Sequence, residues 1–82
     1  MSTEEISEGD EVLFAVYPDW VSSLPEDSRR VFKKCFGKVF RVAEIHKNGL
    51  YELCVADLID PLYGGYKNSI YLEKIYLKKI EK

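Results

Sequence analysis

Residues 37–56, which read GKVFRVAEIHKNGLYELCVA, predict a β-hairpin in the middle of the chain. Asn48-Gly49 is its turn signal, because a type I′ turn needs positive φ at both central positions and Asn-Gly adopts it readily. The stretches on either side are rich in β-branched and aromatic residues, which favour strands. We therefore expect strands over residues 39–45 and 50–56, joined by a two-residue turn.

The first of these strands changes its hydrophobic period near its end. Phe40 and Val42 point inward together, and Ile45 breaks their alternation. A β-bulge near Ala43-Glu44 restores the pattern, because a bulge inserts one extra residue into a strand. Bulges also supply the coiling that small barrels need. The sequence therefore predicts a bulged, coiled strand at this point.

Outward from the hairpin, the pattern predicts three more short strands. Val12, Phe14 and Val16 share one face and indicate a strand over residues 12–16. Residues 57–69 contain a proline, two adjacent glycines and two tyrosines, which is typical of a long irregular loop. After that loop we expect strands over residues 70–72 and 77–80, with a single 3₁₀ turn over residues 73–76 between them.

A helix is expected over about residues 24–36. Ser23 and Glu26 have the spacing of a capping box, in which the two residues satisfy each other's backbone donors. Gly37 supplies the left-handed conformation that ends a helix. Apolar side chains recur at helical spacing on one face: Leu24, Val31, Phe32, Cys35 and Phe36.

Length and composition indicate one small globular domain. The chain has 82 residues, of which 46% are hydrophobic and 32% charged. Residues 1–8 are polar and without periodicity, so we expect a disordered tail followed by one domain over residues 9–82. The N-terminus lacks the basic and apolar regions of a signal peptide, and no apolar run approaches a membrane span. We expect a cytoplasmic monomer without membrane contact.

Five short strands with one 3₁₀ turn before the last resemble an SH3-like barrel. The resemblance rests on Gly9-Asp10-Glu11-Val12, on residues 37–42 with the Asn-Gly turn, and on residues 70–77. The chain also resembles a group of short uncharacterised bacterial proteins. The resemblance implies a mainly β fold, namely a five-stranded SH3-like barrel with one α-helix inserted after strand one.

No residue pattern indicates catalysis, a metal or a cofactor. His46 is the lone histidine and lies beside the predicted turn, so we expect a solvated loop side chain. Cys35 and Cys54 lie in apolar patterns and are expected to be reduced core thiols, with a disulfide or a metal site as the alternative. Gly64-Gly65 fits a turn better than a phosphate-binding loop. We therefore expect no enzyme, no metal and no cofactor.

Aromatic residues in the predicted loops suggest a surface for a protein partner. Tyrosine and tryptophan offer large amphipathic contact areas and recur in recognition surfaces. For Trp20 the alternative is an anchor that fastens the inserted helix to the barrel. The preferred hypothesis is a non-catalytic protein-interaction module that binds through Tyr17, Trp20, Tyr63, Tyr66 and Tyr71.

Charge is distributed unevenly along the chain. Residues 1–27 hold eight acidic and no basic side chains, whereas residues 28–82 hold 12 basic and six acidic ones. The alternative hypothesis is an RNA- or DNA-binding surface on the helix, since phosphates attract such a stripe. A solvated helix face and a pI near 5.4 speak against it. The residues of this basic stripe are Arg29, Arg30, Lys33 and Lys34.

Overall fold

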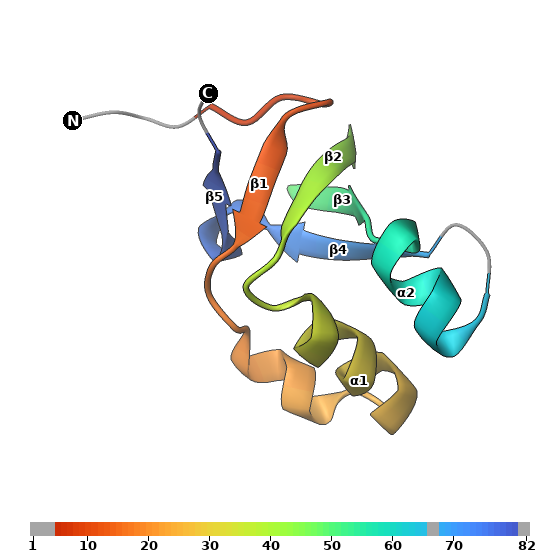
Figure 1. The fold of residues 1–82 in the computed structure, drawn as a ribbon. Helices are drawn as coiled ribbons and strands as arrows, with labels where there is room; N and C mark the ends of the chain where they lie inside the picture. The colour runs from red at the N-terminus through yellow and green to blue at the C-terminus, as the bar shows by residue number, and fades with distance from the viewer. Residues whose placement is uncertain (1–4, 66–67, 81–82) are drawn as a thin grey trace.

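The computed structural model describes residues 5–65 and 68–80. Within them the chain forms one sheet of five antiparallel strands (Figure 1). The strands are β1 (Glu11–Phe14), β2 (Val39–Ile45), β3 (Leu50–Cys54), β4 (Ser69–Glu73) and β5 (Leu77–Lys79). Their order across the sheet is β4-β3-β2-β1-β5, so the hairpin of β2 and β3 lies near the middle. All five predicted strands are confirmed to within two residues at each end.

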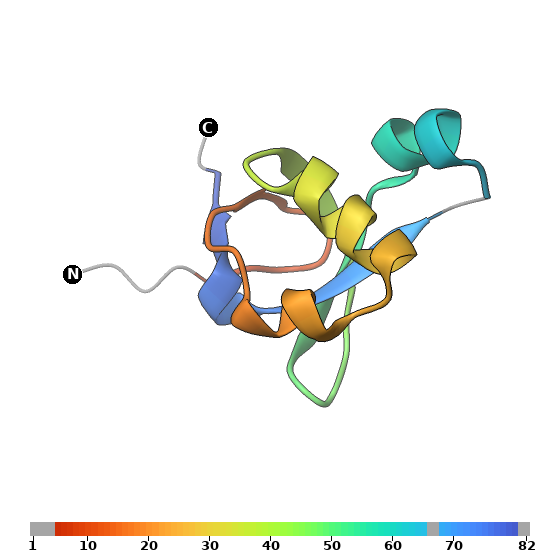
Figure 2. The same cartoon turned by 90° about the horizontal axis from the view of Figure 1, so that it is seen from below.

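Two α-helices and two 3₁₀ turns connect the strands. They are η1 (Asp19–Ser23), α1 (Glu26–Cys35), α2 (Ala56–Tyr63) and η2 (Lys74–Tyr76). η1 and α1 follow one another between β1 and β2 and lie side by side, whereas α2 lies apart, next to the beginning of β4 (Figures 1 and 2). The predicted 3₁₀ turn is confirmed as η2. The chain is therefore an α+β domain.

The sheet is open at both edges. In the part of the chain that the structure describes, β4 pairs with β3 alone and β5 pairs with β1 alone. The closed barrel expected from the resemblance is therefore not confirmed. The helix expected between the first two strands is present as α1, together with η1 before it.

The bulge in β2 is confirmed, and it sorts the hairpin side chains between the two faces. Val42 pairs with Leu53 and Glu44 with Glu52, so Ala43 is the extra residue. Because of this insertion Glu44 leaves the face of Val42, and the next residue, Ile45, packs against the core instead.

The loop between β2 and β3 is one residue longer than the predicted two-residue turn. The His46 amide donates to the Leu50 carbonyl at 2.9 Å, and the Gly49 amide donates to the His46 carbonyl at 3.1 Å. These bonds enclose a three-residue loop, residues 47–49, with Gly49 at φ 89°. The side-chain oxygen of Asn48 stabilises the loop by accepting a hydrogen bond from the Leu50 amide at 3.2 Å.

The helix α1 begins later than predicted, and the capping box is wrong. Pro25 is the N-cap and no side chain caps the first turn. Ser23 lies in η1 instead, because the chain first makes a separate 3₁₀ turn there. Arg29 Nη1 bonds the Leu24 carbonyl at 3.0 Å, which holds the junction between η1 and α1.

Part of the region predicted as an irregular loop is the helix α2. Pro61 lies inside this helix and removes one backbone donor. Ile59 is 1% exposed, and Leu58 packs against the core. Burial of this apolar side therefore offsets the cost of the proline in a helix of only eight residues. Gly64 ends the helix at φ 83°, donating its amide to the Asp60 carbonyl at 2.9 Å.

The segment from Glu5 to Asp10 lies against the sheet. Ile6 is 7% exposed and belongs to the core. Asp10 accepts the Ser7 amide at 2.8 Å, and its carboxylate lies 3.5 Å from Lys79 Nζ. The Ser7 amide, followed by the Lys79 ammonium, lowers the pKa of Asp10. Residues 1–4 of the predicted tail lie outside the described part, so the boundary of the tail stays a prediction.

The core lies between the sheet and the helical segments. Three of the helical segments contribute buried side chains: Val21 from η1, Phe32 and Cys35 from α1, and Ile59 from α2. Among the described residues, no helix has both the length and the apolar character needed to cross a membrane. Val55, directly after β3, is fully buried as well, and the buried strand residues of the core are Val12, Phe14, Phe40, Val42, Leu53, Ile70, Leu72 and Leu77.

Candidate functional site

A groove of about 470 Å³ lies between α1 and the open edge of the sheet at β4. Four consecutive residues, Asn68–Tyr71, line one side of it. Since successive strand side chains point to opposite faces, consecutive lining residues indicate that the groove follows the strand edge. The other side comes from η1, α1 and the segment between them: Trp20, Leu24, Asp27, Ser28, Val31 and Phe32.

Trp20 forms one wall of this groove and fastens η1 to its neighbours. Its indole Nε1 donates to the Tyr76 hydroxyl at 3.2 Å. Its ring stands edge-on to Phe32, with centroids 5.5 Å apart, and to Tyr76, with centroids 6.1 Å apart. These contacts are those of the anchor considered from the sequence. The side chain is nevertheless 38% exposed, so an open part of it faces the groove.

Tyr71 forms the facing wall and belongs to a polar row on the outer face of the sheet. It is 45% exposed and pairs in register with Glu52 of β3. The Glu52 carboxylate raises the pKa of the Tyr71 hydroxyl. The imidazole of His46 lies 5.4 Å from the tyrosine ring, tilted by 49°. Tyr71 thus touches both the groove and this polar row.

Two other predicted aromatic residues, Tyr17 and Tyr63, do not join Trp20 and Tyr71. Tyr17 stacks on Phe14 at 6.4 Å and stands edge-on to Phe36 at 5.3 Å, at the end of β1. Tyr63 ends α2, where the Arg30 guanidinium lies 4.4 Å from its ring centre. Tyr66 lies outside the described residues. Of the four predicted binding residues that the structure describes, it therefore brings together two.

The basic stripe is divided between structural contacts and open surface. Arg29 bonds the Leu24 carbonyl, and Arg30 lies over the Tyr63 ring and 3.4 Å from the Asp27 carboxylate. Two of the four cations are thus engaged within the fold. The other two, Lys33 and Lys34, are exposed on the last turns of α1.

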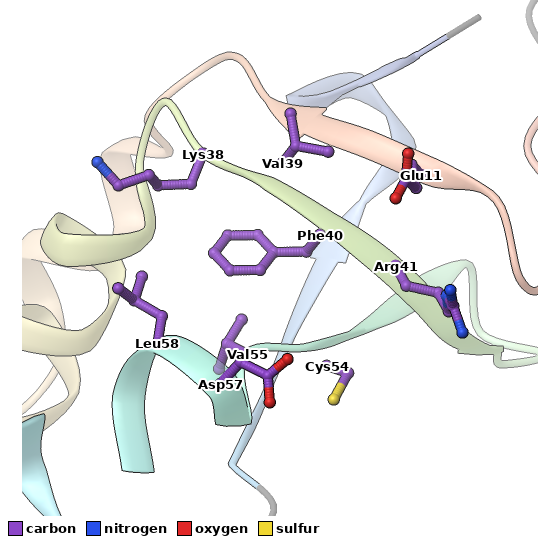
Figure 3. A pocket seen from close by; sticks show the side chains of 9 residues that line it. All are labelled: Glu11, Lys38, Val39, Phe40, Arg41, Cys54, Val55, Asp57 and Leu58. Carbon is purple, nitrogen blue, oxygen red and sulfur yellow. The ribbon is translucent and has the colours of Figure 1, made fainter. Parts of the chain in front are cut away.

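A second hollow, of about 600 Å³, lies where the beginning of β2 faces the end of β3 and the first turn of α2 (Figure 3). The Phe40 ring lies at its centre, with Val55 and Leu58 facing it from the side of α2. A rim of mixed sign attracts neither anions nor cations strongly over long range. The charged side chains of this rim are Glu11, Lys38, Arg41 and Asp57.

The two cysteines differ in environment, which corrects the prediction that both lie in the core. Cys35 is fully buried, and burial raises the pKa of its thiol to about 11. Cys54 is exposed at the second hollow, because it lies on the outer face of β3, opposite Arg41. Both thiols are free, so neither forms a disulfide.

His46 is half-buried and paired, not a solvated loop side chain. Its Nε2 lies 3.0 Å from Glu52 Oε1, and this hydrogen bond lowers the pKa of the Glu52 carboxyl. Glu44 lies close by on the same face. The sequence reasoning missed this cluster because the assumed two-residue turn pairs Glu52 with Ile45. The observed three-residue loop and the bulge pair Glu52 with Glu44 instead.

The groove is the site that combines apolar walls with nearby polar groups and an open strand edge. The polar side chains among its described lining residues are Asp27, Ser28, Asn68, Ser69 and Tyr71. Comparison with protein-family models, with curated protein sequences and with solved structures found no match to this chain.

Proposed function

We propose that this chain is a non-catalytic protein-interaction module, of SH3-like type and cytoplasmic, that binds an extended apolar peptide segment in the groove between α1 and β4. The observation that carries the proposal is the meeting of Trp20 and Tyr71 across one groove beside an open strand edge. Both aromatic side chains are partly exposed there.

The open edge of β4 supplies the main-chain part of such binding. A strand that is paired on one side directs backbone donors and acceptors to the other side, where an extended peptide can add as a further strand. Main-chain bonds of this kind give affinity without regard to peptide sequence. Asn68 at the beginning of this edge is held by Asp60, which accepts its amide at 3.2 Å and bonds its side chain as well.

The apolar walls supply the side-chain part. Val31 and Leu24 are partly buried and Ile70 is buried, so the groove floor is apolar, and the two aromatic rings close it on either side. Aromatic residues of this kind carry much of the energy of protein interfaces. Alternate apolar side chains of an extended peptide would face this floor.

The test is selection from a random peptide library displayed on phage, with the full chain as bait. We expect extended apolar peptides, and their Kd values measured by fluorescence polarisation should rise about 30-fold or more in groove variants, since a central hot spot contributes about 2 kcal/mol. The groove variants are Val31→Lys and Tyr71→Ala. Tyr63→Ala is the matched control, because it removes an exposed aromatic ring outside the groove.

Two results would contradict the proposal. One is an absence of enriched peptides. The other is equal affinity of wild type, Val31→Lys and Tyr71→Ala for the selected peptides. A peptide with methylated backbone amides at alternate positions separates the main-chain contribution, because methylation removes donors while keeping every side chain.

A further inference from the structure

Two glutamates and the lone histidine converge on the outer face of the hairpin, away from the groove floor. One oxygen from Glu44, one from Glu52 and one nitrogen of His46 all lie within 4.8 Å of one another. Glu44 is exposed, whereas the other two are half-buried. We propose that these three side chains form a binding site for a divalent transition-metal ion of the Zn²⁺ type.

The backbone holds the three groups on one face by two separate devices. The bulge at Ala43 turns Glu44 outward, directly opposite Glu52. The loop over residues 47–49 begins after His46, whose amide is bonded to the Leu50 carbonyl, so the chain is still extended at His46. His46 therefore shares a face with Glu44, two positions before it. A plain two-residue hairpin without a bulge would place the two glutamates on opposite faces.

The distances suit a small transition-metal ion. Zn–N and Zn–O bonds of about 2.0–2.2 Å in a tetrahedral site place ligand atoms roughly 3.3–3.5 Å apart. His46 Nε2 and Glu52 Oε1 are already 3.0 Å apart. Glu44 completes the site by a movement of about an ångström, which its exposed side chain can make. Imidazole favours zinc-like ions over magnesium or calcium.

The charges of the cluster also favour a cation. Like charges directly opposite on paired strands are destabilising, and Glu44 and Glu52 are such a pair. Within the described ranges 5–65 and 68–80, no lysine or arginine forms an ion pair with either glutamate. A bound divalent ion would neutralise both carboxylates at once.

Tyr71 gives the site a supporting neighbour. It lies opposite Glu52 on β4, and its ring packs beside the His46 imidazole. Contacts of this kind orient ligands and commonly change metal affinity by about 10–100-fold.

The test is calorimetric titration of the full chain with ZnCl₂, at about pH 7.5 because the ligands must be deprotonated, and with a reducing agent. We expect one ion per chain, and a melting temperature that rises with the concentration of free Zn²⁺. We expect the Kd for zinc to rise about tenfold or more in each of Glu44→Gln, His46→Gln and Glu52→Gln. Loss of a neighbour that only orients a ligand already costs about tenfold, so loss of a ligand should cost at least as much. Since the chain has one histidine, a shift of its imidazole NMR signals on zinc addition reports this site directly in the wild type.

Two control variants should bind zinc like the wild type. Cys54→Ser removes the exposed thiol, which is the obvious competing ligand. Glu73→Gln removes a carboxylate of β4 outside the cluster. Unchanged binding in the three ligand variants, loss of binding in Cys54→Ser, or imidazole signals that do not move with zinc would each overturn the proposal.

Discussion

Replacement of Phe32 by alanine tests whether α1 is part of the folded core. Phe32 is 9% exposed and stands edge-on to Phe14 at 6.3 Å and to Trp20 at 5.5 Å. Truncation of such a side chain costs about 3–5 kcal/mol, because apolar contact is lost and a cavity remains. A chain of this length has a total stability of roughly 4–12 kcal/mol, so the variant loses a large share of it.

The assay is heat and urea unfolding followed by circular dichroism. A loss of about 3–5 kcal/mol corresponds to a fall in Tm of roughly 12–40 °C, at about 4–8 °C per kcal/mol for a domain of this size. Phe32→Leu keeps most of the apolar volume but loses both edge-on ring pairs, which contribute about 1–3 kcal/mol together. Lys33→Ala, an exposed change on the same helix, should stay within about 0.5 kcal/mol. A loss below about 1 kcal/mol in Phe32→Ala would refute the reasoning and make α1 a peripheral arm.

Three further predictions concern thiols, pH and nucleic acid. The exposed Cys54 should react quickly with a thiol reagent in the native chain, whereas Cys35 should react only in denaturant, because it is buried and its pKa is raised to about 11. Cys54→Ser should therefore abolish the fast reaction. The folded pKa of Asp10 is lowered, so its stabilising effect is present above the unfolded pKa and disappears as pH falls through the folded pKa. Urea unfolding should therefore show Asp10→Asn to be less stable than wild type at neutral pH, with a difference that shrinks as the pH falls below the unfolded pKa of about 3.9. Equal stability at neutral pH would contradict this. If the basic stripe binds RNA or DNA, a mobility shift should be visible at about 50 mM salt, weaken steeply as salt rises, and disappear in the double variant of Lys33 and Lys34 to Glu; no shift at low salt removes that hypothesis.

The strands and the bulge could be predicted because local sequence determines them. Val42 and Ile45 can both face the core only if one extra residue lies between them, and the structure places the bulge there. The helix α2 could not be predicted, because Pro61 and the glycines after it are local signals against a helix. The burial of Ile59 against distant strands outweighs them, and this contact is not visible in the local pattern.

The candidate sites depend on register and on long-range contacts. Trp20 and Tyr71 are far apart in sequence, and they come to one groove because η1 and α1 lie opposite β4 in the folded chain. Tyr17 and Tyr63 carry the same sequence signal, yet they contact Phe36 and Arg30 away from the groove. The cluster around His46 needed the correct loop length, and a one-residue error in the turn moves every pairing in the hairpin.

The bulge at Ala43 decides where the hairpin can change in length during evolution. Loss of Ala43 would leave Val42, Glu44 and Ile45 in regular alternation, so the carboxylate would stay outward and the isoleucine would stay against the core. A gain or loss of residues in the loop over residues 47–49 changes only the tip. Related chains should therefore vary in length at this tip and at the bulge, and the tip is the place where a protein engineer can insert a tag or a grafted loop.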